Sequence, residues 1–281
     1  MFKKVLALGL VISCSVFANK YDNVTISSEP VTDNIYMLKG AGGNIGVIKD
    51  GQSLLLVDDQ FEPLAEKIKA HLLASLNASD VDYLINTHFH GDHTGGNIVF
   101  GKDGTILAHD NVRERLLQKF DSKSPALPVI TYDRGVKVHF AGETINVVHK
   151  PAGHTDGDSI VFFEESNVVH AGDLFFEGRF PYIDLNNGGT VDGFISNVAF
   201  IFDQTDSNTR IMPGHGDLTN RAALGQYLTM MRETAAFIKA EKAKGKDLPS
   251  LIDQGLPDKW KSWSWSFITE EKWITTLYRG Q

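Results

Sequence analysis

The amino-acid sequence predicts an α/β protein in which β-sheets are layered against helices. Short apolar runs bounded by Gly, Asp and Asn are typical of strands, and several are followed by segments with helical spacing. This order of strand, polar loop and helix recurs along the chain and favours a layered α/β sandwich. Of the 281 residues, 42% are hydrophobic and 22% charged, which is typical of a globular protein with a substantial core.

The pattern places the elements in order. Strands are expected first at 24–26, 35–38, 45–48 and 54–57. A helix at 63–76 then leads into a strand at 81–85, and a strand at 105–108 leads into a helix at 111–120. Strands at 160–163 and 168–171 precede a helix at 191–202.

The last third of the chain contains a strongly amphipathic segment. One helical face would carry Leu224, Leu228, Met231, Ala235 and Ile238, which predicts a helix that packs on a sheet. Beyond it lies a short tail rich in tryptophan, at Trp260, Trp263, Trp265 and Trp273. This tail either packs back on the body of the protein or lines the rim of a pocket.

The first 18 residues are typical of a signal peptide. Lys3 and Lys4 precede an apolar run at 5–17, and small residues end at Ala18, where we expect cleavage. The remainder, 19–281, is predicted to be a single domain with a helical, Trp-rich extension from about residue 217, in the periplasm or secreted. The apolar run is shorter than the ~20 residues of a membrane span, so no stable membrane insertion is expected. Residues 11–14 also resemble a lipobox, which would make Cys14 a lipid attachment site.

Charge and cysteine content limit the function. A formal net charge of −8 without a basic stripe disfavours nucleic acid as a partner and favours a small-molecule substrate. Cys14 is the only cysteine and would leave with the signal peptide. Histidines and carboxylates would then have to hold any metal ion in the mature protein.

The densest group of metal-ligand residue types lies directly after an apolar strand. Residues 87–93 read THFHGDH, which supplies His88, His90, Asp92 and His93. In an extended loop, His88 and His90 project to the same side while Asp92 and His93 turn elsewhere, so one segment can serve two metal ions. Gly91, together with the glycines at 95–96, is expected to supply tight turns.

Three further candidate ligands lie downstream, and each ends an apolar run and follows a glycine. They are His154, Asp173 and His215. This shared context indicates that the three side chains meet at one edge of the sheets.

At this point the chain resembles the metallo-β-lactamase superfamily. HxHxDH, AGHTDGD, HAGD and PGHG occur in the order and rough spacing of that family, from about Asp33 to Gly216. The resemblance implies an αββα sandwich, in which two β-sheets are flanked by helices and two zinc ions lie at one edge. It also implies His88, His90 and His154 as ligands of the first zinc, Asp92, His93 and His215 of the second, and Asp173 as the bridging carboxylate. Asp58 resembles a carboxylate that supports the ligand loop.

The chain departs from the branch of the family that uses a cysteine ligand. That branch carries a thiolate where Asp173 stands here, and three residues later a lysine where Phe176 stands. An aspartate bridge is similar to hydroxyacylglutathione hydrolases and lactonases, although lactonases tend to have tyrosine in place of Phe176. Efficient β-lactam hydrolysis is therefore not expected.

Two such metals predict a hydrolase. Divalent ions lower the pKa of bound water to about 7 and supply hydroxide without a separate base. The hydroxide would cleave an amide, ester or lactone, with weak β-lactamase-like activity, and Asp92 would orient it. Thioester or lactone hydrolysis of the glyoxalase II or lactonase type is one alternative, and iron-dependent persulfide dioxygenation is another; iron or manganese in place of zinc stays open. Arg179, Tyr182 and Asn186 are the expected substrate contacts, with Asn187 beside them, and Phe89, Phe175 and Phe176 suggest an apolar wall.

Overall fold

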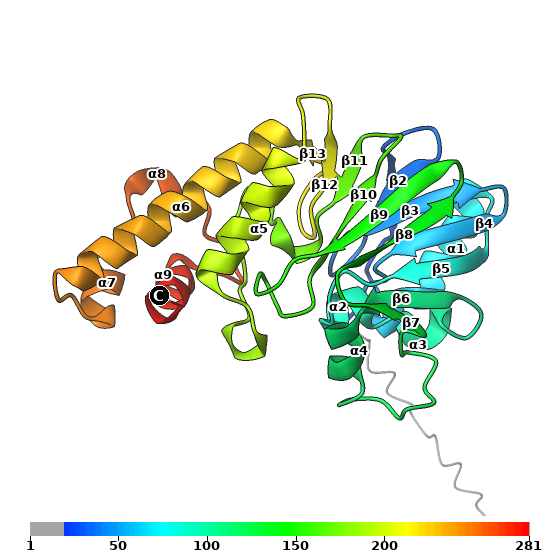
Figure 1. Cartoon of the computed structure of the whole chain (residues 1–281), viewed down its shortest axis with the longest axis horizontal. Coiled ribbons are helices and arrows are strands. Elements are labelled where there is room, and N and C mark those ends of the chain that lie inside the picture. The colour runs from blue at the N-terminus through cyan, green and yellow to red at the C-terminus, as the bar shows by residue number, and fades with distance from the viewer. Residues whose placement is uncertain (1–19, 281) are drawn as a thin grey trace, which may run out of the picture.

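The structure is a computed structural model that describes residues 20–280, and it places two β-sheets face to face between helices (Figure 1). The first sheet has seven strands, paired in chain order: β1 Ser27–Pro30, β2 Ile35–Lys39, β3 Ile45–Asp50, β4 Ser53–Val57, β5 Asp80–Ile85, β6 Thr105–His109 and β7 Ile130–Tyr132. The second has six strands in the order β13-β12-β11-β10-β9-β8: β8 Gly135–Phe140, β9 Glu143–His149, β10 Ser159–Phe163, β11 Val168–His170, β12 Arg210–Met212 and β13 Thr219–Asn220.

The helices lie outside the sheets and at their edge. The α-helices are α1 Ala65–Leu76, α2 Gly91–Thr94, α3 Asn97–Phe100, α4 Asp110–Leu116, α5 Val191–Asp203, α6 Arg221–Ala243, α7 Leu248–Gln254, α8 Asp258–Lys261 and α9 Glu270–Arg279. Short 3-10 turns cover Glu62–Leu64, Gly172–Leu174 and Leu185–Asn187.

Three apolar clusters hold the layers together. Between the sheets, side chains such as Val57 and Ile85 of the first sheet meet Val147 and Val161 of the second. A second cluster packs α1 on the outer face of the first sheet, and a third packs α5 and α6 on the outer face of the second. Because the central strands are covered on both faces, their sequences are continuously apolar, as in the run 54–57 of β4.

The directions of the strands place the loops that carry the candidate metal ligands at one edge of the two sheets. In the first sheet, β4, β5 and β6 run parallel. In the second, β9 and β11 are both antiparallel to β10, and β11 is parallel to β12, so β9, β11 and β12 share one direction. The segments that follow the carboxyl ends of β5, β9, β11 and β12 therefore come together.

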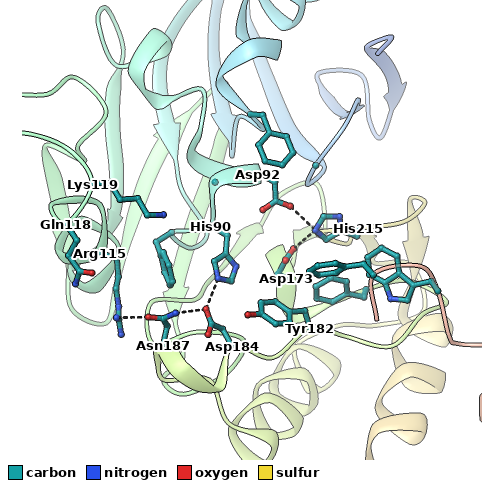
Figure 2. A pocket seen from close by; sticks show the side chains of 17 residues that line it. His90, Asp92, Arg115, Gln118, Lys119, Asp173, Tyr182, Asp184, Asn187 and His215 are labelled. Atoms are coloured by element: carbon teal, nitrogen blue, oxygen red, sulfur yellow. Dashed lines mark hydrogen bonds and ion pairs between the residues drawn. The ribbon is translucent and has the colours of Figure 1, made fainter. Parts of the chain in front are cut away.

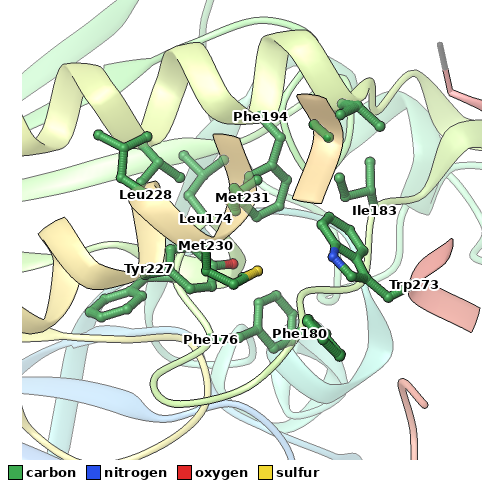
Figure 3. Packing of buried hydrophobic residues seen from close by; sticks show 14 of the residues in the cluster. Leu174, Phe176, Phe180, Ile183, Phe194, Tyr227, Leu228, Met230, Met231 and Trp273 are labelled. Carbon is green, nitrogen blue, oxygen red and sulfur yellow. The ribbon is translucent and has the colours of Figure 1, made fainter. Parts of the chain in front are cut away.

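The C-terminal segment packs on α6 and completes the apolar cluster outside the second sheet. Trp273 of α9 is fully buried, its indole nitrogen donates to Thr234 Oγ1 at 3.1 Å, and its ring stacks 5.8 Å from Phe180. Figure 3 shows Trp273 beside Phe180 and Ile183, close to the side chains of α6. The apolar cluster of the second sheet, α5 and α6 thus extends without a break to the end of the described chain.

Most of the predicted elements are confirmed, as is the α/β sandwich, and the amphipathic face from Leu224 to Ile238 is buried. The strand predicted at 24–26 is wrong, because β1 lies at Ser27–Pro30. The helix predicted at 111–120 ends at Leu116. Strands β7, β8, β9, β12 and β13 were not predicted; β8 alternates exposed and half-buried residues and so has no apolar run.

The predicted signal peptide and the lipid site at Cys14 lie outside the described residues and stay predictions. Within residues 20–280, no helix combines the length and the apolar character that a membrane span requires.

Candidate metal centre

The seven candidate ligands meet at the edge where the parallel strands end. His88 and His90 follow β5, and Asp92 and His93 lie within α2. His154 lies in the loop between β9 and β10, Asp173 in the 3-10 turn after β11, and His215 after β12. The motif is therefore only partly an extended loop, because its second half is a helical turn. That turn places Asp92 and His93 in a different ligand group from the first two histidines.

The ligand atoms form two adjacent groups. The first contains His88, His90, His154 and Asp173, and the second contains Asp92, His93 and His215. Within each group the potential ligand atoms lie within 4.8 Å of one another. The structure thus brings together all seven residues that the sequence singled out, in the two sets that the resemblance implies.

Asp173 lies between the two groups and offers one oxygen to each. Its Oδ2 is 3.8 Å from His88 Nε2 and 3.5 Å from His154 Nε2. Its Oδ1 is 3.0 Å from His93 Nε2 and 3.3 Å from His215 Nε2. A carboxylate in this position is arranged to bridge two cations.

Hydrogen bonds orient the histidines of the motif toward this carboxylate. His93 Nδ1 donates to Asp58 Oδ2 at 2.7 Å, which leaves Nε2 free to act as a ligand. Asp58 in turn accepts the Thr87 amide and hydroxyl at 2.8 and 2.7 Å. His88 Nδ1 lies 3.1 Å from that hydroxyl oxygen. Asp58 therefore supports the ligand loop, as its place at the end of β4 suggested.

The other two histidines of the first group are held in the same way. His154 Nδ1 donates to the carbonyl of Tyr182 at 2.8 Å, so its Nε2 faces the centre. His90 Nε2 donates to Asp184 Oδ2 at 3.0 Å, so its Nδ1 faces the centre. Asp184 also accepts from Asn187 Nδ2 at 2.8 Å. Burial opposes ionisation of Asp184, but the hydrogen bonds from His90 and Asn187 outweigh it and hold its pKa at about 2.

The two groups differ in charge. Burial lowers the pKa of His88 well below its ordinary value and that of His154 to about 4, so both are neutral imidazoles. Burial also opposes charging of His215, but Asp173 and Asp92 outweigh it and raise its pKa to about 9. Without an ion, the second group therefore holds protons that a cation would displace.

The chemistry of these side chains fits divalent cations. His93 Nε2 and Asp173 Oδ1 are buried and neither has a partner in hydrogen-bond geometry among residues 20–280, although they lie 3.0 Å apart. Buried polar atoms without partners are rare and need an explanation. Neutral imidazole and carboxylate ligands are the set that zinc and neighbouring transition metals accept.

The glycines beside the ligands are needed for close approach. A Cβ at Gly214 would lie 2.1 Å from Asp173 Oδ1, and one at Gly43 would lie 2.1 Å from the His93 ring. A Cβ at Gly95 or Gly96 would lie only 2.8–2.9 Å from backbone atoms of the loop after β4. Gly91 has open space around its Cβ position and no positive φ, so the expectation that it supplies a tight turn is wrong.

A cavity of about 770 Å³ opens over the metal centre. Tyr182, Phe89 and Phe176 line it as expected, and Phe176 stacks on His215 with ring centroids 5.0 Å apart. Phe175 and Arg179 are not part of the lining, because Phe175 is buried against Tyr227 and the guanidinium of Arg179 lies over the Trp265 ring at 5.1 Å. Asn187 lines the cavity but Asn186 is exposed, because the 3-10 turn Leu185–Asn187 directs the two side chains differently.

Sequence reasoning missed several residues of the cavity. Figure 2 shows a chain of contacts from Arg115 through Asn187 and Asp184 to His90. Arg115 and Lys119 are spaced i, i+4 in the predicted helix 111–120, a spacing that would have placed both on one face. Asp184 has no local motif and could not have been found from the sequence.

Comparisons with known proteins agree with this fold and site. A family model of the metallo-β-lactamase superfamily matches residues 38–221, which is more than half of the chain. The chain therefore belongs to the metallo-β-lactamase superfamily.

Two curated relatives each match more than half of the chain. The beta-lactamase-like protein 2 homolog of Caenorhabditis elegans is 28% identical over 216 residues, which are 72% of this chain and 66% of that protein. The hydroxyacylglutathione hydrolase of Nitrosococcus oceani is 30% identical over 151 residues, 52% of this chain and 53% of that protein. The chain thus spans just under two thirds and about half of the length of these relatives.

Solved structures share the fold at low identity. A metallo-β-lactamase from Pontibacter korlensis has a TM-score of 0.63 and 14% identity, with 74% of this chain and 99% of that chain covered. A sec-alkylsulfatase from Pseudomonas sp. has a TM-score of 0.70 and 13% identity, with 91% of this chain and 50% of that chain covered.

Proposed function

We propose that the protein is a hydrolase that binds two zinc ions and cleaves an ester, lactone, thioester or amide bond in a small molecule. The observation that carries the proposal is the position of Asp173, whose two carboxylate oxygens face two separate sets of ligands. His88, His90 and His154 would hold one ion, and Asp92, His93 and His215 the other. When bound, such ions supply a water molecule that ionises near neutral pH and an acid that polarises a carbonyl group.

Asp92 is the more exposed of the two candidate carboxylate ligands, and it lines the cavity. Its Oδ2 lies 3.4 Å from His215 Nε2 and 3.7 Å from His93 Nε2, and its side chain is 25% exposed. Burial opposes its ionisation, but His93 and His215 outweigh this and lower its pKa. Asp92 can therefore orient the attacking water by accepting a hydrogen bond from it, and it can hold a proton on its way to the leaving group.

Tyr182 is placed to act on the substrate. Its side chain lines the cavity, and Figure 2 shows its hydroxyl group turned toward the side of Asp184. Burial raises its pKa, so the hydroxyl stays protonated and can donate a hydrogen bond to the carbonyl or the leaving group. The rings of Phe89 and Phe176 exclude water from the same cavity.

Two residues favour substrates with a scissile ester, lactone or thioester bond over β-lactams. Asp173 stands where the cysteine-using branch has a thiolate, and Phe176, which is buried against His215, stands where that branch has a lysine. The similarity to a hydroxyacylglutathione hydrolase supports the thioester alternative in particular. We therefore rank esters, lactones and thioesters above β-lactams.

The test is a hydrolysis panel with metal exchange. Protein is stripped with a chelator, reloaded with Zn²⁺, Mn²⁺ or Fe²⁺, and given aryl esters, lactones, acyl thioesters, a carbapenem and a cephalosporin. We expect turnover of at least one of the first three classes, lost on chelation and restored by zinc. Asp173→Asn should abolish turnover, and Asp82→Asn, an exposed aspartate of β5, serves as its matched control. Turnover that survives chelation, or iron bound at stoichiometry with oxidation of a persulfide, would overturn the proposal.

A further inference from the structure

The cavity over the metal centre has two walls of different chemistry. Its volume of about 770 Å³ is that of a site for a small molecule. Figure 2 shows Arg115, Gln118 and Lys119 on one side of His90, and Tyr182 and His215 on the other. The first wall is formed by α4 and the turn after it, and it carries the only arginine and lysine among the described residues that line the cavity, Arg115 and Lys119.

Of these two cations, only Lys119 is unpaired. Arg115 Nη2 lies 2.6 Å from Asp156 Oδ2, and its Nη1 donates to Asn187 Oδ1 at 2.8 Å, so its charge is balanced within the protein. Lys119 is exposed and no carboxylate lies within ion-pair distance of it in the described part of the chain. Its ammonium group lies 5.6 Å from the centre of the Phe89 ring, at the mouth of the cavity.

The opposite wall is aromatic and comes largely from the C-terminal segment. Phe267 packs 5.7 Å from Tyr182, and Trp265 packs 5.5 Å from Phe267. The indole nitrogen of Trp265 donates to the carbonyl of Phe180 at 3.0 Å, so the part of the indole that faces the cavity is apolar. Phe267 is 50% exposed, and covering such a ring with an apolar group is favourable.

The acidic side chains lie between these walls. Asp92, Asp173 and Asp184 all line the cavity beside the metal centre. Bound metal ions would not neutralise every carboxylate beside the centre, and Asp184 is one that keeps its charge. Asp184 would therefore repel an anionic group of a substrate, whereas Lys119 would attract it. An apolar group would gain most beside Trp265 and Phe267.

We infer that the substrate is a small organic acid whose carboxylate lies at Lys119, whose scissile bond lies over Asp173, and whose apolar, ring-sized group packs on Trp265 and Phe267. This inference rests on the proposed hydrolase function and adds the chemical class of the substrate and its orientation in the cavity. Lys119 and Phe267 are then specificity-determining residues from segments far apart in the sequence.

A pair of matched esters tests the proposed orientation of the substrate in the cavity, with its carboxylate at Lys119. Mono-4-nitrophenyl glutarate carries a free carboxylate on the acyl side and an aromatic leaving group, and its methyl ester differs only in lacking the charge. The zinc-loaded protein is expected to prefer the acid in kcat/KM. Lys119→Gln should lower that preference about fivefold, the size of a well-placed exposed ion pair. Lys102→Gln, an exposed lysine away from the cavity, should keep the wild-type preference.

The aromatic wall is tested with the same pair. Phe267→Ala should raise KM for both esters by a similar factor, because it removes apolar contact and no charge. The inference is overturned if the wild-type protein prefers the methyl ester, or if Lys119→Gln leaves the preference unchanged.

A binding measurement separates this inference from the proposed function. Glutaranilic acid, the anilide of the same acid, is titrated into the zinc-loaded protein and followed by tryptophan fluorescence, with Trp265→Phe to assign the signal. Lys119-dependent binding without hydrolysis of either ester would overturn the hydrolase and keep the substrate class. Hydrolysis of both esters with equal kcat/KM would keep the hydrolase and overturn the substrate class. Absence of both binding and hydrolysis would overturn both.

Discussion

The Nδ1 nitrogen of His93 lies 2.7 Å from the Oδ2 oxygen of Asp58, and both side chains are fully buried. The same carboxylate accepts two hydrogen bonds from Thr87, at the start of the ligand motif. One residue at the end of β4 therefore fixes both the direction of His93 and the path of the loop.

Asp58→Asn should weaken the second metal site. The amide cannot accept as many hydrogen bonds, and one of its N–H groups would meet a donor of His93 or Thr87. Loss of such a supporting carboxylate typically costs about 10–100-fold in metal affinity. Competition with a chromophoric chelator measures the two affinities, and Asp103→Asn, at an exposed position, is the control. Equal affinities in Asp58→Asn and wild type would show that the contact does not orient the ligand.

Asp184→Ala should act on the first site instead. Asp184 orients His90 from the side opposite the metal centre. We expect the affinity for the first ion to fall about 10–100-fold, with a smaller loss for Asp184→Asn, which keeps one acceptor oxygen. The measurement is again a chelator competition, read separately for each ion. A lower melting temperature with unchanged affinity for both ions would reduce Asp184 to a purely structural role.

Gly214→Ala and Gly91→Ala should have opposite outcomes, although both glycines adjoin ligands. A Cβ at Gly214 would lie 2.1 Å from Asp173 Oδ1 and 2.6 Å from the carbonyl oxygen of Gly172, whereas nothing lies within 4 Å of one at Gly91. Displacement of Asp173 by about 1 Å should cost about a hundredfold in hydrolysis. Gly91→Ala should keep both ions and gain up to ~1 kcal/mol in stability. Metal content and thermal unfolding measure the pair, and loss of ions from Gly91→Ala would contradict the account.

A stacked histidine pair outside the metal centre should make the protein sensitive to acid. The rings of His109 and His149 lie 3.6 Å apart, and burial lowers the pKa of each; for His149 the neighbouring His109 lowers it further. A folded pKa below the unfolded value of about 6.5 means that the unfolded chain binds more protons in acid. The stability that the neutral pair contributes is therefore present above pH 6.5 and is lost as the pH falls through the folded values.

The contribution of this histidine pair is isolated by comparing how steeply the free energy of unfolding changes with pH in the wild type and in a variant. The free energy of unfolding of metal-free protein is measured between pH 5 and 8 for the wild type and for His149→Gln. We expect the variant to lose less stability than the wild type between pH 7 and pH 5, and the two curves to run parallel above pH 7. Parallel curves over the whole range would show that the pair does not titrate on unfolding.

The metal centre was predictable because its ligands carry local signals. Four of the ligands lie within six consecutive positions, at His88, His90, Asp92 and His93. The three distant ligands each follow a strand and a glycine. The glycines marked the right positions, and at 214 the structural reason is the lack of space for a Cβ beside Asp173. At Gly91 the same reasoning failed, because the chain enters α2 there without any crowding.

The fold was predictable where strands are buried on both faces. Strands β3, β4 and β10 each contain a run of buried apolar residues, since helices cover one side and the other sheet covers the second. By contrast, β8 exposes every second residue and has no such run, so a prediction based on apolar runs does not find it.

The substrate side of the cavity could not be derived from the sequence. Lys119, Asp184 and Phe267 come from three separate parts of the chain, and none of them belongs to a motif. Only the tertiary packing of the C-terminal segment on α6 and on the loop after β11 brings Trp265 and Phe267 to the cavity that α4 borders on its other side.

The number of metal ions per chain, measured together with hydrolysis, tests the central claim most directly. Protein reloaded with zinc and freed of excess metal is analysed for elemental content while aryl ester, lactone and thioester turnover are followed during stepwise removal of the ions. The account predicts two zinc ions per wild-type chain, a loss of turnover as they leave, and fewer than two ions in Asp173→Asn. Full turnover by a metal-free chain, or two ions retained by Asp173→Asn with unchanged turnover, would contradict it.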